Sequence, residues 1–554
     1  MSFDLRLKEA ASSPGARETS SRRRSDAVSR GLLALLLVVA ASAYLWGVGK
    51  DLPWVYESDE AKLTLIAAQM ATSFDPDPGW FGHPGSTVLY PQAAAIQIDD
   101  AIRTGRSWVA PDASLFQRFA DDPSRAVLLG RLFSVAYAIL SLPLVVAIGN
   151  RAFGAPVGLV AAWLALLSPL TLDHAHMVRT DTAGMFFGSL GLWLCLRLLD
   201  RPSLAAHVAT GLAIGLGIGT RWFLGALVVI LVAVDLRLWR QAYDPDARRR
   251  ALREALAALV AVAVGFAVST PFFFLEIGTV LADFAHEARE SHPGSDGLGF
   301  AGNLAFYLGN ALPRDAGPLQ VALAAAGIVW ALARGRPEPR LLLAFVAIYL
   351  VGISTSALHW ERWLIQVRPL VVLFSAAALV WGATALTRRM RLSPRASGLA
   401  IVAVVALVSI APASRFVAAA LAQARPSTRV TGAEWITANV PPGGRVAAEL
   451  YTAPLDEKRY RVDYRFSLAE SASSPETYRR AGYDYLMVSS AVHGRFLANP
   501  ARYPKEVAFY RALFRDGKLV ADIVPEPGQR GPRIRLYRLV RPRPAPPSVR
   551  PPPG

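Results

Sequence analysis

The chain has 554 residues, of which 53% are hydrophobic and only 18% are charged, and its mean hydropathy is +0.32. This composition excludes a soluble globular protein, because too much apolar surface would face water. The net charge of +17 does not indicate a nucleic-acid partner, because the basic residues gather in turns between apolar segments, where anionic lipid accounts for them.

Residues 1–30 are rich in Ser and Arg and poor in apolar residues, so we expect a disordered cytoplasmic head. Apolar segments long enough to cross a bilayer follow, and they predict about eleven transmembrane helices. These segments lie at 31–49, 126–148, 155–172, 182–199, 204–219, 222–238, 255–275, 317–333, 341–358, 367–386 and 398–414. We expect the first to remain as an anchor, since no small-residue cleavage site follows it.

Basic residues in alternate turns define the predicted orientation. Cytoplasmic turns of membrane proteins carry an excess of Lys and Arg. With the N-terminus inside, the basic turns near 237–253, 334–340 and 388–395 are all cytoplasmic. This predicts a multi-pass protein of the inner (plasma) membrane. The outer segments are then 50–125, 173–181, 276–316, 359–366 and everything after about 415.

The first outer loop, 50–125, combines two amphipathic runs with a Pro- and Gly-rich segment. "DEAKLTLIAAQMATSF" places Leu63, Ile66, Ala67 and Met70 at helical spacing, and "HPGSTVLYPQAAAIQIDDAI" is a second such run. Both are predicted to be helices on the membrane surface. Between them, "FDPDPGWFGHPG" predicts a shaped loop. Its Asp-Pro-Asp sequence is typical of a turn, with a divalent-metal site as the alternative.

Charged residues recur at span ends on the outer side. A charge in hydrocarbon costs on the order of 3 kcal/mol, so such residues usually face a water-filled cavity or each other. Each alone is typical of an interfacial side chain, but together they favour a functional cavity. A carboxylate base beside guanidinium groups fits chemistry on a phosphate-bearing substrate. The residues are Asp59, Glu60, Arg131, His174, His176, Arg179, Asp181, Arg221, His359, Glu361, Arg362 and Arg368.

Several of these segments together resemble a known family. They are the Asp-Glu pair after the first span, the "DPxPxWFxHP" loop, "RLFSVAYAILSLPLVVAIGNRAFG", "LLSPLTLDHAHMVRTDT" and "ERWLIQVRPLVVL". The combination resembles the GT-C glycosyltransferases of the protein O-mannosyltransferase and aminoarabinose transferase type. The similarity runs over about residues 31–390.

The resemblance implies an inverting enzyme that moves a sugar from a polyprenyl or dolichyl phosphate to an acceptor on the outer side of the membrane. It implies that Asp59 is the catalytic base, Glu60 its partner and Asp181 the second acidic residue. Arg131 matches an arginine near the donor phosphate. His83 stands where many aminoarabinose-type members have the lysine of a Lys-Pro pair, and Arg221 and Arg362 are further candidates for the phosphate.

The same resemblance leaves Arg179, His176 and Glu361 as substrate contacts. It implies no cofactor, with a divalent metal left open. The expected partners are the lipid-linked donor, membrane lipids and a lipid, glycan or protein acceptor. Two other functions fit parts of the same pattern. A secondary transporter also has many spans with buried charge, but usually shows repeats and midplane charges. A non-catalytic assembly factor is disfavoured by the complete set of charged residues.

The predicted domain organisation is a transmembrane GT-C catalytic domain at 31–420, with a large outer loop at 276–316, followed by a soluble outer α/β domain at 427–540. The second domain is inferred from a helix, a Pro-Gly turn and a strand in "TGAEWITANVPPGGRVAAELY", and from "YDYLMVSS", "KEVAFYRALFRDG" and "RIRLYRLV". The Pro-rich tail, 541–554, is expected to be disordered.

Overall fold

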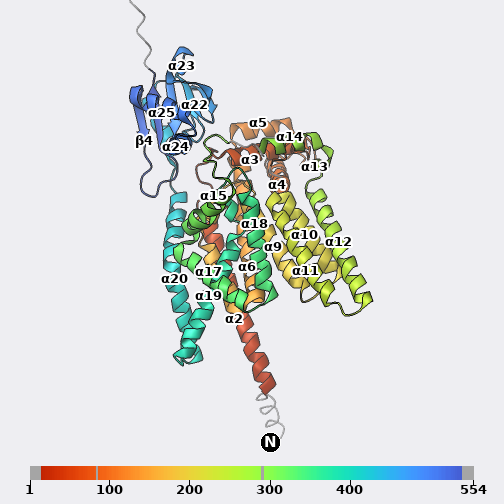
Figure 1. Cartoon of the computed structure of the whole chain (residues 1–554). Coiled ribbons are helices and arrows are strands. Elements are labelled where there is room, and N and C mark those ends of the chain that lie inside the picture. Colours follow the sequence, from red (N-terminus) through yellow and green to blue (C-terminus); the bar gives the residue numbers. More distant parts are fainter. Residues whose placement is uncertain (1–13, 83–84, 288–291, 540–554) are drawn as a thin grey trace, which may run out of the picture. The chain divides into compact units, whose positions relative to one another are not determined.

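The structure is a computed structural model that describes residues 14–82, 85–287 and 292–539. It divides into two compact units (Figure 1). Unit 1 holds residues 1–49, 59–289 and 298–420, and unit 2 holds residues 50–58, 290–297 and 421–554. The Pro-rich tail at 541–554 and residues 1–13 of the head lie outside the described residues.

Unit 1 is entirely helical in the part that the structure describes. Its helices are α2 (Pro14–Leu45), α3 (Ser58–Ser73), α4 (Ser86–Thr104), α5 (Ala113–Asp121), α6 (Ser124–Phe153), α7 (Ala155–Leu166), α8 (Pro169–Ala175), α9 (Asp181–Leu198), α10 (Leu204–Thr220), η1 (Trp222–Gly225), α11 (Ala226–Gln241), α12 (Pro245–Ser269), α13 (Phe272–Leu275), α14 (Ile277–Glu287), α15 (Gly299–Phe306), η2 (Tyr307–Ala311), α16 (Leu312–Ala316), α17 (Pro318–Ala333), α18 (Pro337–Ser354), η3 (Glu361–Leu364), α19 (Arg368–Arg389) and α20 (Pro394–Gln423). The expected disorder up to residue 30 differs from the structure, in which α2 begins at Pro14.

The structure confirms a polytopic helical membrane protein. Within the described residues, seven helices are long and apolar enough to cross a membrane, or up to nine if each of two bent pairs is one span. The expected number of about eleven is not confirmed. One reason is α10, which has 17 residues and is shorter than a usual span.

The glycines of "GLAIGLGIGT" explain how this short helix is held. A Cβ at Gly211 would lie 2.2 Å from the Ala258 carbonyl oxygen, and one at Gly215 would lie 2.3 Å from the Val262 carbonyl oxygen. Glycine spaced by four residues therefore lets the backbones of α10 and α12 approach closely.

A buried ion pair stabilises the 64° break between α7 and α8. Arg368, on α19, pairs with Asp315 and donates to the carbonyl oxygens of Ala165 (3.0 Å) and Leu164 (3.3 Å) at the end of α7. Asp315 accepts from the Ser168 hydroxyl at 2.8 Å, just before α8. The pair thus satisfies groups that a broken helix leaves without intrahelical partners.

The two ends of unit 1 carry different features. In Figure 1, α3, α4, α5, α13 and α14 lie at one end of the long helices, and the basic connection between α11 and α12 lies at the other. The helices predicted in the first outer loop are therefore present, and they gather at the end opposite a basic turn.

Unit 2 is an α/β domain with a five-stranded sheet of order β2-β1-β3-β5-β4. Its elements are α21 (Thr428–Asn439), β1 (Arg445–Glu449), β2 (Arg461–Arg465), α22 (Leu468–Ser471), α23 (Pro475–Arg480), β3 (Tyr485–Ser489), α24 (Ser490–Ala498), α25 (Pro504–Asp516), β4 (Lys518–Ile523) and β5 (Ile534–Arg538). β1 pairs in parallel with β2 and β3, whereas β5 is antiparallel to β3 and β4.

Each face of this sheet has its own apolar core. The helix α21 packs over one face, on which Val446, Met487 and Leu536 are buried. The helices α22 to α25 pack over the other face, on which Leu486 and Tyr537 are buried. The predicted small C-terminal α/β domain is therefore present as a sheet between helices.

Candidate active site

Two neighbouring carboxylates at the start of α3 have opposite environments. The Asp59 side chain is 33% exposed, whereas the Glu60 side chain is 2% exposed. Successive helical residues point about 100° apart, so one of them faces the bundle when the other faces its surface. Carboxylates in the first turn also suit the positive end of the helix dipole. Of the two acidic residues that the sequence pattern indicates, only Asp59 is therefore accessible to solvent, whereas Glu60 is enclosed by the protein.

Glu60 is held in a buried, bidentate pair with Arg131 of α6. The Nε and Nη2 atoms of Arg131 each lie 2.8 Å from a Glu60 oxygen, and Nη1 donates to the Val48 carbonyl at 3.0 Å. The backbone N–H of Val178 also donates to Glu60, at 2.9 Å. The pair ties α3, α6 and the junction before α9 together. All three guanidinium nitrogens of Arg131 thus contact protein oxygens.

Asp59 instead faces two arginines from distant segments. The Nη2 atom of Arg362, on η3, lies 3.1 Å from Asp59 Oδ2, and Nη2 of Arg179 lies 3.5 Å from the same oxygen. Both arginine side chains are mostly buried, while Asp59 keeps a third of its surface exposed. The carboxylate is therefore fixed in direction and still open to solvent.

Asp181 lies at the start of α9 and forms the centre of a second cluster. Arg221, at the junction of α10 and η1, places Nη1 2.5 Å from Asp181 Oδ1 and 3.3 Å from the Thr180 hydroxyl. His174 Nδ1 lies 3.4 Å from the other carboxylate oxygen. This buried carboxylate is thus paired, as a charge inside a protein must be.

Arg362 connects the two clusters electrostatically. Burial lowers the pKa of Arg362 from its ordinary value, as does the neighbouring Arg179 cation, whereas Asp59 and Asp181 raise that pKa. Three guanidinium groups, those of Arg179, Arg221 and Arg362, accompany the carboxylates of Asp59 and Asp181. The cluster therefore carries an excess positive charge, which suits an anionic group such as a phosphate.

A lysine one turn after Asp59 adds a further cation that the sequence reasoning missed. Lys62 Nζ lies 3.6 Å from the centre of the Trp80 ring. Burial lowers the pKa of Lys62, while the carboxylates of Asp283, Glu287 and Asp59 raise it. Residues three apart on a helix share a face, so the spacing of Asp59 and Lys62 in "SDEAK" already indicated that the lysine lies beside the carboxylate.

The loop around Trp80 is fixed by α14. The backbone N–H of Phe81 donates to Asp283 at 2.6 Å. Asp75 and Asp77 accept from the backbone N–H groups of Asp77 (3.0 Å) and Gly79 (2.9 Å). The Asp-Pro-Asp segment thus forms successive Asx turns, as its prolines predict. Within the described ranges, no group of three or more His, Cys, Asp or Glu side chains could hold a metal ion.

Two other predicted residues, His176 and Glu361, are not brought to these two clusters. His176 Nε2 lies 2.6 Å from the Tyr44 carbonyl oxygen and is fully buried, so it holds α2. Glu361 pairs with Arg314. His83 lies outside the described residues. His174 rather than His176 accompanies Asp181, and the charge pattern of the junction "DHAHMVRTD" had indicated both histidines.

Comparison with known proteins adds to this geometry. Residues 113–274 match a family model described as dolichyl-phosphate-mannose-protein mannosyltransferase. That range runs from α5 into α13 and contains Arg131, Asp181 and Arg221. No curated protein sequence matches the chain.

Two solved structures are similar over most of their length. The oligosaccharyltransferase AglB from Archaeoglobus fulgidus, in complex with an inhibitory peptide and a dolichol-phosphate, is 13% identical, with a TM-score of 0.51 over 87% of this chain and 72% of that chain. ArnT from Cupriavidus metallidurans is 16% identical, with a TM-score of 0.49 over 92% of this chain and 98% of that chain. The likeness to AglB, with the family match, shows that this chain has the GT-C fold of membrane glycosyltransferases.

Proposed function

We propose that the protein is a glycosyltransferase that moves a sugar from a polyprenyl-phosphate donor to an acceptor on the outer side of the membrane. One observation carries the proposal: Asp59 is a partly exposed carboxylate held by two arginines, beside a second cluster of a carboxylate and an arginine. The GT-C fold supports it. So do the dolichyl phosphate in the family model's description and the dolichol-phosphate in the AglB structure.

In the proposed reaction, Asp59 is the general base. Its carboxylate takes the proton from an acceptor hydroxyl or amine while the acceptor atom attacks C1 of the sugar. A bond forms between the acceptor atom and C1, and the bond from C1 to the phosphate oxygen breaks. The phosphate oxygen leaves with the electron pair, as polyprenyl phosphate. Attack opposite the leaving group inverts C1, and the protein needs no nucleophile of its own.

The arginines supply the second requirement, which is stabilisation of the leaving phosphate. Arg362 and Arg179 face the base, and Arg221 lies beside Asp181, so a phosphate at this place meets preorganised cations. Lys62 adds a fourth cation on the Asp59 side. Arg362 and Arg221 therefore keep the phosphate contacts that the resemblance implies, while Arg179 and Lys62 join them.

Arg131 and Glu60 have a different part in this proposal. Their buried pair fixes the rotation of α3, so that Asp59 faces Arg179 and Arg362. We therefore treat both as positioning residues rather than as groups that touch the substrate. A direct phosphate contact by Arg131 would require it to leave three protein oxygens.

The site is proposed to lie on the outer side of the plasma membrane. In Figure 1 helix α3, which carries Asp59, lies at the end of unit 1 opposite the basic α11–α12 connection, and the excess of Arg in that connection predicts that it is cytoplasmic. Charges clustered at one end, rather than at the midplane, favour this enzyme over a secondary transporter.

Mass spectrometry of cell-envelope glycans and glycoproteins tests the proposal. Cells with the gene should carry a sugar that is missing from cells without it. The wild-type gene should restore that sugar, and a gene encoding Asp59→Asn should not. An envelope that is identical with and without the gene would contradict a glycosyltransferase of the cell surface.

A further inference from the structure

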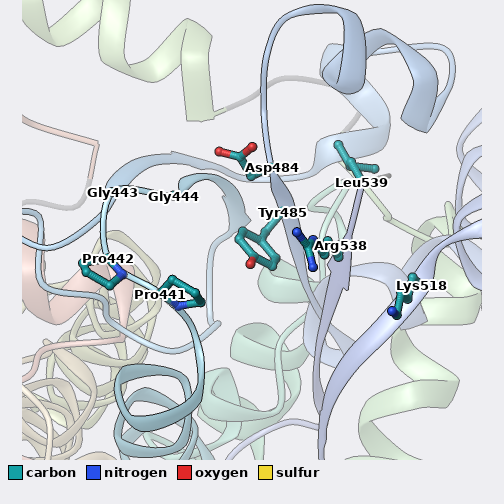
Figure 2. Close-up of a pocket in the computed structure, with 9 residues that line it drawn as sticks. All are labelled: Pro441, Pro442, Gly443, Gly444, Asp484, Tyr485, Lys518, Arg538 and Leu539. Carbon is teal, nitrogen blue, oxygen red and sulfur yellow. The ribbon is translucent and has the colours of Figure 1, made fainter. Parts of the chain in front are cut away.

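A cavity that shares no residue with the two charged clusters lies within the C-terminal α/β domain. It measures about 720 Å³, and its lining includes Pro441, Gly444, Tyr485, Lys518 and Arg538. Figure 2 shows Tyr485 beside Arg538, Lys518 on the neighbouring strand, and the Pro441-Pro442 turn on the other side. A cavity of roughly 300–1,000 Å³ is the size in which proteins bind small molecules.

The strand register places two cations on one face of the sheet. Arg538 of β5 stands opposite Tyr485 of β3 on one side and opposite Lys518 of β4 on the other. Directly opposed residues of antiparallel strands point to the same face. Their face is the one covered by α21, and the cavity begins where α21 ends at Asn439.

Opposed like charges destabilise a sheet, so this pair needs an explanation. Lys518 and Arg538 are both exposed, and neither forms an ion pair with a carboxylate in the part of the chain that the structure describes. Elsewhere in the same sheet Arg533 and Arg535 share Asp522, and Arg465 pairs with Asp463, whereas Arg445 of β1 and Arg461 of β2 also stand opposite each other. The lining also includes one carboxylate, Asp484, so the cavity carries two cations and one anion, and an anionic ligand would balance the remaining positive charge.

The rest of the lining suits a sugar better than a bare anion. The Tyr485 ring is packed against Gly444, where a Cβ would lie 3.2 Å from the ring Cε2 atom and would require the ring to shift slightly. The tyrosine ring and Pro441 offer apolar surface to the C–H face of a sugar ring, and the tyrosine hydroxyl can exchange hydrogen bonds with sugar hydroxyls. Inorganic phosphate would leave most of the cavity unfilled.

We propose that this cavity binds an anionic saccharide, a sugar unit that carries a carboxylate or phosphate group, with Lys518 and Arg538 on the anion and Tyr485 against the ring. Its further assignment as part of the acceptor glycan rests on the function proposed above. The C-terminal domain then selects acceptor chains by a charged unit, at a place distinct from the catalytic carboxylate.

Binding of trigalacturonate to the full chain in phosphatidylcholine nanodiscs tests this assignment by isothermal titration calorimetry. Trigalacturonate should bind, whereas maltotriose, a neutral trisaccharide, should not bind measurably. Lys518→Gln with Arg538→Gln should weaken binding by about tenfold or more, because two charge-assisted contacts are lost. Without the saccharide, the double variant should unfold at the same or a higher temperature, because the opposed charges are gone.

The matched control is Lys505→Gln with Arg511→Gln, which removes the same charge from exposed positions on α25. It should bind as the wild type does. Equal weakening in both double variants, or maltotriose binding as tightly as trigalacturonate, would overturn the site. If inorganic phosphate at the same concentration displaced trigalacturonate, the assignment of the ligand as a saccharide would be wrong. Asp59→Asn should bind trigalacturonate normally, so failure of this site and failure of the catalytic proposal are separable.

Discussion

The guanidinium group of Arg362 lies 3.1 Å from the carboxylate of Asp59, although one stands in a turn before α19 and the other at the start of α3. The proposed base and a proposed phosphate contact are thus in direct contact. A donor phosphate that attracts Arg362 weakens its hold on Asp59, and the carboxylate then becomes a stronger base. Donor binding and base activity are therefore coupled through one ion pair.

Asp59→Asn should abolish most turnover while leaving the fold and donor binding intact. The amide keeps the shape of the carboxylate and cannot accept the acceptor's proton, so the rate should fall by about 10²- to 10⁴-fold. Sugar transfer from a polyprenyl-phosphate donor measures the rate. Glu57→Gln is the control, because Glu57 pairs with Arg429 of unit 2 at 3.6 Å, and it should keep most activity. If Asp59→Asn is active and Asp181→Asn is not, Asp181 is the base.

Arg362→Gln should weaken binding of the donor. Loss of a hydrogen bond to a charged group is worth roughly 1.5–3 kcal/mol, or about 10- to 150-fold in affinity. Titration of purified protein with a polyprenyl-phosphate sugar measures it. Arg314→Gln, which removes an arginine paired with Glu361 in the same unit, is the matched control and should bind as the wild type does. Equal affinity of all three proteins would exclude Arg362 from the phosphate site.

Arg131→Met should destabilise the protein rather than act on donor affinity alone. It leaves Glu60 buried without its cation, and breaking a buried pair costs about 3–5 kcal/mol. Adding Glu60→Gln should restore most of the stability, because a neutral amide can still accept from the Val178 N–H. Thermal unfolding in detergent distinguishes the cases. A single variant with normal stability and weak donor binding would instead make Arg131 a phosphate contact, as the resemblance implies.

The stability of the C-terminal sheet should fall as pH rises, through Glu449. Burial raises the pKa of Glu449 from 4.5 to about 8, despite hydrogen bonds from Tyr510 and two backbone N–H groups, and the nearby Glu470 raises it further. The folded state therefore holds a proton that the unfolded state releases. The contribution of this proton to the free energy of unfolding is fully present below about pH 4.5. It falls by about 1.4 kcal/mol per pH unit as the pH rises to about 8.

Amide hydrogen exchange of β1 and β3 in the wild type and in Glu449→Gln checks this at each pH. Comparison at equal pH removes the intrinsic dependence of exchange on pH. The amide cannot ionise, so in the variant the protection of the β1 and β3 backbone amides against exchange should be the same at pH 5 as at pH 8. Glu457→Gln, at an exposed position of the same unit, should follow the wild type. Parallel curves for all three proteins would remove Glu449 as the titrating group.

The orientation of the chain is testable by cysteine labelling, since Cys195 is the single cysteine and is buried. A cysteine at Ser473, an exposed position in unit 2, should react with an impermeant thiol reagent in intact spheroplasts. One at Tyr243, which is 92% exposed in the α11–α12 connection, should react only after the membrane is opened. The reverse result would put the Asp59 end of unit 1 on the cytoplasmic side.

The sequence predicted the helical membrane architecture because hydropathy over some twenty residues reports it directly. It also indicated the β3 and β5 strands, whose apolar residues pack on both faces. It did not indicate β2 or β4. β2, "RVDYR", lies at one edge of the sheet and has no fully buried residue. Its sequence therefore lacks the clear alternation of apolar and polar residues that indicates a strand with one buried face.

The site was predictable in its residue types but not in its pairings. Asp59, Asp181 and the arginines came from charge at span ends and from a family resemblance. Which cation faces which carboxylate depends on helix rotation and on contacts between distant segments, which no local pattern contains. His174 and His176 are two residues apart, yet one contacts Asp181 and the other a carbonyl of α2.

Because Glu60 and Arg131 form a buried ion pair, α3 and α6 must be exchanged together when segments are swapped between related proteins. A chimaera that keeps the first outer loop of this protein and takes α6 from a related one could leave Glu60 buried without its cation. The first turn of α3 would then rotate or unwind, and Asp59 would lose its direction even though every letter around it was kept. A chimaera of two related proteins that is meant to keep the geometry at Asp59 must therefore take α3 and α6 from the same protein.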